Sequence, residues 1–146
     1  MSIYTHVLVA VDLAPDSAEL ISKAKDIAAR NDAHLSLAHV VEYLPVEPTG
    51  EVLMPPSQDL EPELLEGAQR QLDELAAANG VGDCSRHVVL GNTARDLARL
   101  INEHEVDLLV VGAHERHGLS LLVGGTERSL LRHAPCDVLV IRLKNL

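Results

Sequence analysis

Short runs of apolar residues alternate along this chain with longer stretches in which apolar residues recur every three or four positions. The short runs are nearly continuous in Val, Leu and Ile, which is typical of strands that are covered on both faces. The longer stretches have the period of amphipathic helices. This alternation predicts a parallel sheet built from βα units. The predicted strands are residues 6–11, 35–40, 86–90, 107–112 and 137–143.

Four helices are expected between these strands. Asp16 is predicted to cap the first helix, and Asn79-Gly80 to end the second through a left-handed turn. The third is predicted to follow Asn92 or Thr93, and a shorter fourth to cover residues 126–133. The residues expected to face the core are Leu20, Ile21, Ala24, Ile27 and Ala28 in the first helix, Leu64, Leu65, Ala68, Leu72 and Leu75 in the second, and Ala94, Leu97, Ala98 and Ile101 in the third.

Residues 41–58 interrupt this pattern. Their four prolines exclude a long helix or a central strand. A loop of this length in a small domain is usually functional or mobile. The sequence shows no internal repeat and no linker between domains, so residues 1–146 are expected to form one domain.

Composition narrows the classes of partner. The chain has 12 basic and 22 acidic residues, and its net charge of −10 repels nucleic-acid phosphates and anionic lipid surfaces. It has no Phe or Trp and only two Tyr, so it offers few aromatic platforms on which single-stranded bases could stack. We therefore expect neither a nucleic acid nor a membrane as a partner.

The cysteines and the N-terminal segment indicate a cytoplasmic protein. Cys84 and Cys136 stand far apart and have no CxxC or metal-ligand spacing, so we expect them to be buried free thiols. The apolar run near the N-terminus lacks the basic segment and the cleavage site of a signal peptide. It is also too short to span a bilayer.

A candidate binding site lies at the carboxyl ends of the predicted strands, where open parallel sheets bind their ligands. Glycines at such ends allow a ligand to approach the backbone, and the N-terminus of the following helix offers N–H groups to an anion. The pattern fits a phosphate site, and it fits equally a surface loop that precedes a capped helix. The candidate positions are Ala10, Val11, Asp12, Val40, Gly112, Gly125 and Thr126.

Other polar residues give no catalytic constellation. Asp12 fits either a metal ligand beside a nucleotide or a cap on the turn before the first helix. His114 and His117 lack the third ligand that zinc requires, so we expect them to be solvated, and His39 to be a partly buried structural histidine. No serine has the G-x-S-x-G context, and the glycines before Thr126 lack the lysine of a P-loop. We therefore expect no dedicated catalyst.

Several segments together resemble the universal stress protein family. These are VLVAVDLAPDSAEL, LSLAHVVE, APCDVLVIR and the glycines of the candidate site, and the likeness covers essentially the whole chain. The nucleotide-binding branch of that family has G-x-x-G, nine residues and then G-[S/T] at this place. The resemblance implies a Rossmann-like α/β fold, with one doubly wound parallel five-stranded sheet of order 3-2-1-4-5 and four helices.

The motif of the nucleotide-binding branch is only partly present. Gly112 matches its first glycine, and Gly125 and Thr126 match its closing pair with the full nine-residue spacing. Glu115 stands where the second glycine is expected. Since the family also contains members that bind no nucleotide, this chain lies between the two branches.

The resemblance implies ATP as the ligand, with Mg²⁺ as its companion ion. In ATP-binding members the residues that match Ala10, Val11, Asp12 and Val40 flank the adenine, and the one that matches Gly112 approaches the ribose. The phosphates would be held by the backbone of residues 125–128. The expected nucleotide-binding residues are therefore Ala10, Val11, Asp12, Val40, Gly112, His114, Glu115, Gly125, Thr126, Glu127 and Arg128.

The expected function is that of a stress-responsive regulatory protein that binds adenine nucleotide. Family members commonly dimerise by antiparallel pairing of their last strands, and the apolar segment from Val138 to Leu143 fits this, because an open apolar edge invites pairing. Two alternatives stay open at this point. One is a nucleotide-free dimer that acts through protein–protein contacts, and the other is a weak ATPase.

Overall fold

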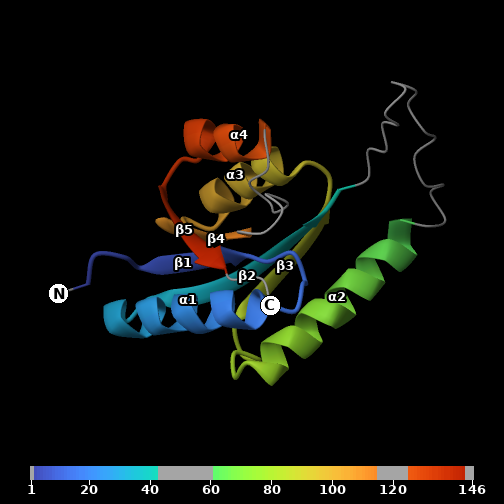
Figure 1. Cartoon of the computed structure of the whole chain (residues 1–146), viewed down its shortest axis with the longest axis horizontal. Helices are drawn as coiled ribbons and strands as arrows, with labels where there is room; N and C mark the ends of the chain where they lie inside the picture. Colours follow the sequence, from blue (N-terminus) through green and yellow to red (C-terminus); the bar gives the residue numbers. More distant parts are fainter. Residues whose placement is uncertain (1, 43–60, 115–124, 144–146) are drawn as a thin grey trace.

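The computed structural model describes residues 2–42, 61–114 and 125–143, which form a parallel sheet with helices on both faces (Figure 1). The strands match the predicted ones to within two residues at each end, and their order is β3-β2-β1-β4-β5, as expected. All four strand pairs are parallel. The strands are β1 (His6–Ala10), β2 (His34–Val41), β3 (Ser85–Leu90), β4 (Leu108–His114) and β5 (Asp137–Leu143).

Helices cover the sheet in two layers, which explains why its strands are apolar on both faces. α1 (Ser17–Asn31) and α2 (Glu61–Ala78) lie on one face, and α3 (Thr93–Glu103) and α4 (Gly125–His133) on the other (Figure 1). Each layer has its own apolar core. The first is built around Val9, Ile21 and Leu72, and the second around Leu8, Leu97 and Leu109.

The cap predicted for α1 is wrong in its chemistry. Asp16 does occupy the N-cap position, but its side chain makes no capping hydrogen bond to the helix. The turn before α1 is instead held by Asp12. Its Oδ1 accepts a hydrogen bond from the amide of Ala14 at 3.0 Å and one from the hydroxyl of Ser17 at 3.3 Å. The turn between them places Leu13 in the left-handed region, with a φ of 66°.

The core face of α2 differs in part from the predicted one. Leu64 is 39% exposed, whereas Ala76, which was not among the expected core residues, is fully buried beside Leu72. The reason is that α2 packs mainly on the edge strand β3, which gives the helix a narrower surface to cover than a central strand would. The predicted turn after α2 is confirmed, since Gly80 has a φ of 72°.

None of the helices in the described ranges is both long and apolar enough to cross a membrane.

Candidate functional site

The carboxyl ends of β2, β1 and β4 lie side by side at one edge of the sheet. β1 pairs with β2 on one side and with β4 on the other, so the chain winds away from it in both directions. This is the switch point at which doubly wound sheets bind their ligands. The structure therefore brings Ala10, Val40 and Gly112 to one edge, as the sequence predicted.

The end of β1 is held firmly to β2. The amide of Val11 donates a hydrogen bond to the carbonyl of Ala38 at 2.9 Å. The carbonyl of Val11 accepts one from Nδ1 of His39 at 2.7 Å, which confirms His39 as a partly buried structural histidine. Both backbone groups of Val11 are thus already hydrogen-bonded within the sheet.

Asp12 performs the structural role that the sequence left open. Its Oδ1 fixes the turn that leads into α1 through the hydrogen bonds to Ala14 and Ser17. A carboxylate held in this way at a strand end is already oriented, so it needs little rearrangement to contact a cation. Among the residues that the structure describes, no group of three or more His, Cys, Asp or Glu side chains could hold a metal ion.

Gly112 lies in a tightly packed part of the core. A β-carbon at this position would lie 2.6 Å from Cδ1 of Leu143 in β5 and 3.5 Å from Cδ2 of Leu20 in α1. A contact as short as the first would force the Leu143 side chain, whose Cγ would lie 3.3 Å away, to shift within the packed core. The first glycine of the sequence motif therefore has a reason to be glycine within the protein's own core, whether or not a ligand approaches it.

The remaining predicted site residues border the connection between β4 and α4. His114 is the last residue of β4, where it pairs with Leu143, and Gly125 is the first residue of α4. Only the backbone is described for His114 and for residues 125–128, which include Thr126, Glu127 and Arg128. Glu115, like His117, lies outside the described residues. α4 begins at Gly125, one residue before the predicted start at Thr126.

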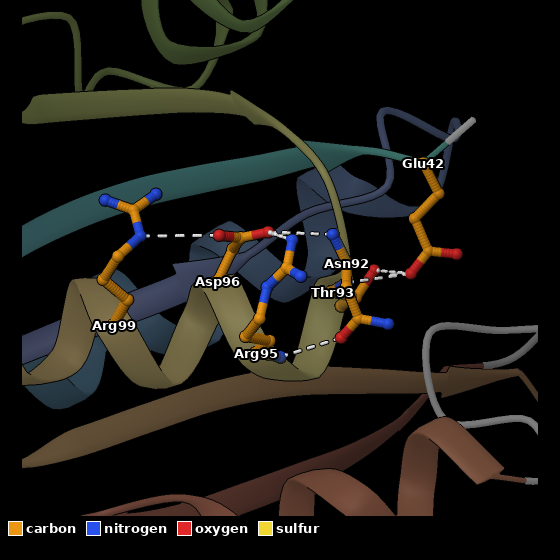
Figure 2. A network of polar contacts seen from close by, with 6 residues as sticks. All are labelled: Glu42, Asn92, Thr93, Arg95, Asp96 and Arg99. Atoms are coloured by element: carbon orange, nitrogen blue, oxygen red, sulfur yellow. Dashed lines mark hydrogen bonds and ion pairs between the residues drawn. The ribbon is translucent and has the colours of Figure 1, made fainter. Parts of the chain in front are cut away.

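The sequence did not reveal a polar network at the N-terminus of the neighbouring helix α3 (Figure 2). Glu42, just beyond β2, accepts hydrogen bonds through Oε1 from the amide of Thr93, at 2.9 Å, and from its hydroxyl. The Asn92 side chain accepts one from the amide of Arg95 at 2.9 Å, so Asn92, one of the two residues that the helix was predicted to follow, is the N-cap. The amide of Asn92 donates in turn to Oδ2 of Asp96 at 2.8 Å.

Asp96 is the buried centre of this network. Its carboxylate lies 3.3 Å from the guanidinium of Arg95 and 3.4 Å from that of Arg99 (Figure 2). Burial would raise the pKa of Asp96, but the hydrogen bonds from the Asn92 amide and from Arg95 outweigh it, so that the pKa lies below its usual value. Gly91 precedes the network, and a β-carbon there would collide with Oδ2 of Asp96.

This network engages amides at the start of α3 that an anion would otherwise bind. A helix N-terminus binds anions through amides that have no partner within the helix. At α3 the backbone amides of Asn92, Thr93 and Arg95 already donate hydrogen bonds to side chains of the protein. The Asn92 cap could be predicted from the sequence, but Glu42 could not, because it comes from a strand 51 residues away.

The two cysteines are free thiols, as predicted, but they are only partly buried. Cys84 lies just before the edge strand β3, and Cys136 just before the other edge strand, β5, where the sheet leaves them partly uncovered. Burial raises the pKa of Cys84, although Arg86 opposes it. Burial also raises the pKa of Cys136, to about 11, and its Sγ donates to the carbonyl of Asp137 at 3.3 Å. Neither thiol is therefore activated as a nucleophile.

Comparison with known proteins agrees with this architecture. A sequence profile described as "Universal stress protein family" matches residues 3–142. Universal stress protein A homolog 1 of Coxiella burnetii is 37% identical over 141 residues, which cover 97% of this chain and 98% of that protein. Universal stress protein UspA from Lactobacillus plantarum is 27% identical with a TM-score of 0.68, and the match covers 97% of this chain and all of that one.

A third relative was solved with a nucleotide. The crystal structure of a universal stress protein in complex with cAMP matches with a TM-score of 0.63 and 28% identity. The match covers 96% of this chain and 98% of that chain.

Proposed function

Because the chain belongs to the universal stress protein family, we propose that it is a stress-responsive regulatory protein that binds adenine nucleotide at the carboxyl ends of β1, β2 and β4. The observation that carries this proposal is the pairing of β1 with both β2 and β4, which puts Ala10, Val40 and Gly112 on one edge. The N-terminus of α4 follows on the β4 side, at Gly125.

The nature of the ligand follows from what this edge can offer. β1 ends in apolar residues at Ala10 and Val11, so in our proposal the flat face of a base lies against this strand end, where it needs no hydrogen bonds. The backbone amides at the start of α4 suit phosphates. A relative solved in complex with cAMP supports an adenine nucleotide as the class, and our specific proposal is ATP.

A bound ATP would bring Mg²⁺ to the phosphates, and we propose Asp12 as the carboxylate that contacts the ion. Mg²⁺ in such sites is usually held by one or two carboxylates together with phosphate oxygens and waters. The hydrogen bonds from the Ala14 amide and the Ser17 hydroxyl orient the Asp12 carboxylate before any ion binds. Asp12 would thus serve both the fold and the ion.

We expect Glu115 to weaken the binding of ATP. A carboxylate about 5 Å from a phosphate charge would cost about 1 kcal/mol in water-like surroundings and about 3 kcal/mol at an effective dielectric near 20. Arg116, His117 and Arg128, which follow Glu115 in the sequence, would offset part of this cost. We propose binding that is roughly ten- to a hundredfold weaker than with glycine at this position.

We further propose that the protein is a homodimer that pairs its last strands. β5 is an edge strand, and Leu139 and Val140 on it are 37% and 39% exposed. Ile141 and Leu143 on the same strand are buried. An apolar edge that is open in the monomer is a template for pairing, and a second copy of the chain would cover it.

The second candidate is a nucleotide-free dimer that acts through protein–protein contacts. The packing of Leu143 against Gly112 favours it, because this glycine is then explained without a ligand. A weak ATPase is the third candidate, and ATP hydrolysis well above that of a buffer blank would support it. For all three we propose a cytoplasmic location, which the free thiols of Cys84 and Cys136 support.

Nucleotide carried through purification tests the proposal. Protein purified without added nucleotide is denatured, and the released small molecules are separated by chromatography and identified by mass. We expect adenine nucleotide at a substantial fraction of one per chain in the Glu115→Gly variant and less in the wild type. Absence of nucleotide from both proteins, together with no uptake from added ATP, would favour the nucleotide-free dimer.

A further inference from the structure

Four of the eight histidines are linked by contacts that run from the start of β1 and β2 to β3 and the C-terminal end of α3. His6 begins β1 and pairs with His34, which begins β2, and their rings meet edge to face with centroids 6.4 Å apart. His87 lies in β3, and His104 is the C-cap residue of α3. Imidazole is the side chain whose charge changes between pH 5 and 8, so this cluster joins four such groups.

His6 fastens the end of α3 to the sheet. Its Nδ1 lies 2.9 Å from the carbonyl of His104, and its Nε2 lies 2.6 Å from Oγ of Ser36. Since a carbonyl only accepts, Nδ1 carries the hydrogen, and the Nε2 of a neutral ring then accepts from the Ser36 hydroxyl. Ser36 is 2% exposed.

His87 and His104 form the second contact between α3 and the sheet. Their rings are tilted by 32°, and their centroids are 4.4 Å apart. Burial lowers the pKa of His87, and the nearby His104 and His6 lower it further, whereas Glu103 raises it. The structure thus stabilises neutral His87, and two imidazolium rings at this separation would repel each other.

The other charged groups near the cluster are already engaged. Glu103 is paired with Arg99 along α3 at 3.1 Å. Asp107, between α3 and β4, accepts hydrogen bonds from the amides of Thr5 and His6 at 2.8 and 2.9 Å. Arg86, next to His87 in β3, is bonded to Asp73 in α2 on the other side of the sheet. No carboxylate in the described ranges forms an ion pair with any of the four rings.

We infer that His6, His87 and His104 form an acid-sensitive latch, which fastens the C-terminal end of α3 to β1 and β3 at neutral pH and loosens it when the His87 ring gains a proton. The element that moves is α3 with the short connection to β4. Its other end carries Thr93, which Glu42 holds beside the candidate ligand site. Acidification would therefore act on a helix that spans from the latch to that site.

Amide hydrogen exchange of the full-length protein tests the latch. Protection factors of the peptide covering residues 100–107 are measured at pH 7.5 and pH 5.5, each corrected for the intrinsic exchange rate at that pH. We expect protection to fall by about tenfold in the wild type, which corresponds to one pKa unit of differential protonation. The fall should disappear in the double variant His87→Gln, His104→Gln. It should persist in His133→Gln, which removes an exposed histidine from α4.

Two results would overturn the latch. One is equal protection of the wild type at both pH values, and the other is an undiminished fall in the double variant. If the double variant does not fold, the His87 ring protons of the wild type are titrated by NMR instead. A midpoint below about 6.5 supports the latch, and a midpoint at or above that value contradicts it.

Discussion

Leu143, the last residue of β5, packs so closely on Gly112 of β4 that a β-carbon on the glycine would lie 2.6 Å from its Cδ1. The contact joins the edge strand proposed for dimer formation to the strand end proposed for nucleotide binding. Any change at Gly112 must therefore be read for its effect on packing as well as on binding.

The substitution Gly112→Ala should lower the free energy of unfolding by about 1–3 kcal/mol, because it overfills a packed core. The matched control is Gly67→Ala in α2, where a β-carbon would meet nothing within 4 Å. That change should stabilise the protein by about 0.5–1 kcal/mol, since alanine favours a helix over glycine. Urea unfolding of both variants checks the prediction. Equal stability of the two variants would contradict the packing role of Gly112.

The network at the N-terminus of α3 should depend on Asp96. We expect Asp96→Asn to cost about 1–3 kcal/mol, because it weakens hydrogen bonds to Asn92 and to two arginines in a buried place. The control is Asp26→Asn, which removes an exposed ion pair with Arg30 and should cost less than about 1 kcal/mol.

The cost of Asp96→Asn should also depend on pH. The pKa of Asp96 is lowered in the folded protein, so its contribution is complete above the unfolded value near 3.9 and is lost as pH falls below it. The stability difference between wild type and variant should thus be constant from pH 7 to 5 and should shrink below pH 4. A difference that grows in acid would contradict the assignment.

Both thiols should react slowly in the native protein. Burial raises the pKa of Cys136 to about 11 and that of Cys84 above its usual value, so few thiolates exist at pH 7.5. Labelling with a chromogenic disulfide, in wild type and in Cys136→Ser, separates the two. We expect both cysteines to react much faster in urea. Native labelling as fast as in urea would show that the prediction is wrong.

The proposed dimer should be sensitive to one residue of β5. Val140→Lys should shift the protein toward monomer, because it places a charge in the middle of the paired edge. Leu64→Lys is a closely matched control, since Leu64 is also 39% exposed but lies on α2, which packs mainly on the opposite edge strand, β3. Analytical ultracentrifugation at roughly micromolar concentrations checks both. A monomeric wild type would contradict the dimer.

The fold followed from the sequence because local patterns carry it. Continuous runs such as VLVAV mark strands buried on both faces, and the resemblance supplied the strand order. Long-range chemistry was out of reach for the same reason. No local pattern around Thr93 indicates that Glu42 is its hydrogen-bond partner. None around His6 indicates that Ser36 and His104 are its partners. The exposure of Leu64 could not be predicted from periodicity either. Periodicity identifies the apolar face of a helix but not how wide a surface of the protein that face covers.

Calorimetric titration with ATP and Mg²⁺ tests the central claim of nucleotide binding most directly. The proteins compared are the wild type, Glu115→Gly, Gly125→Val and the Gly67→Ala control. We predict measurable binding by the wild type, tightening by up to roughly a hundredfold in Glu115→Gly that shrinks as salt rises, and loss in Gly125→Val, where a branched side chain would stand at the start of α4. No binding heat from any of the four proteins, all folded by circular dichroism, would contradict it.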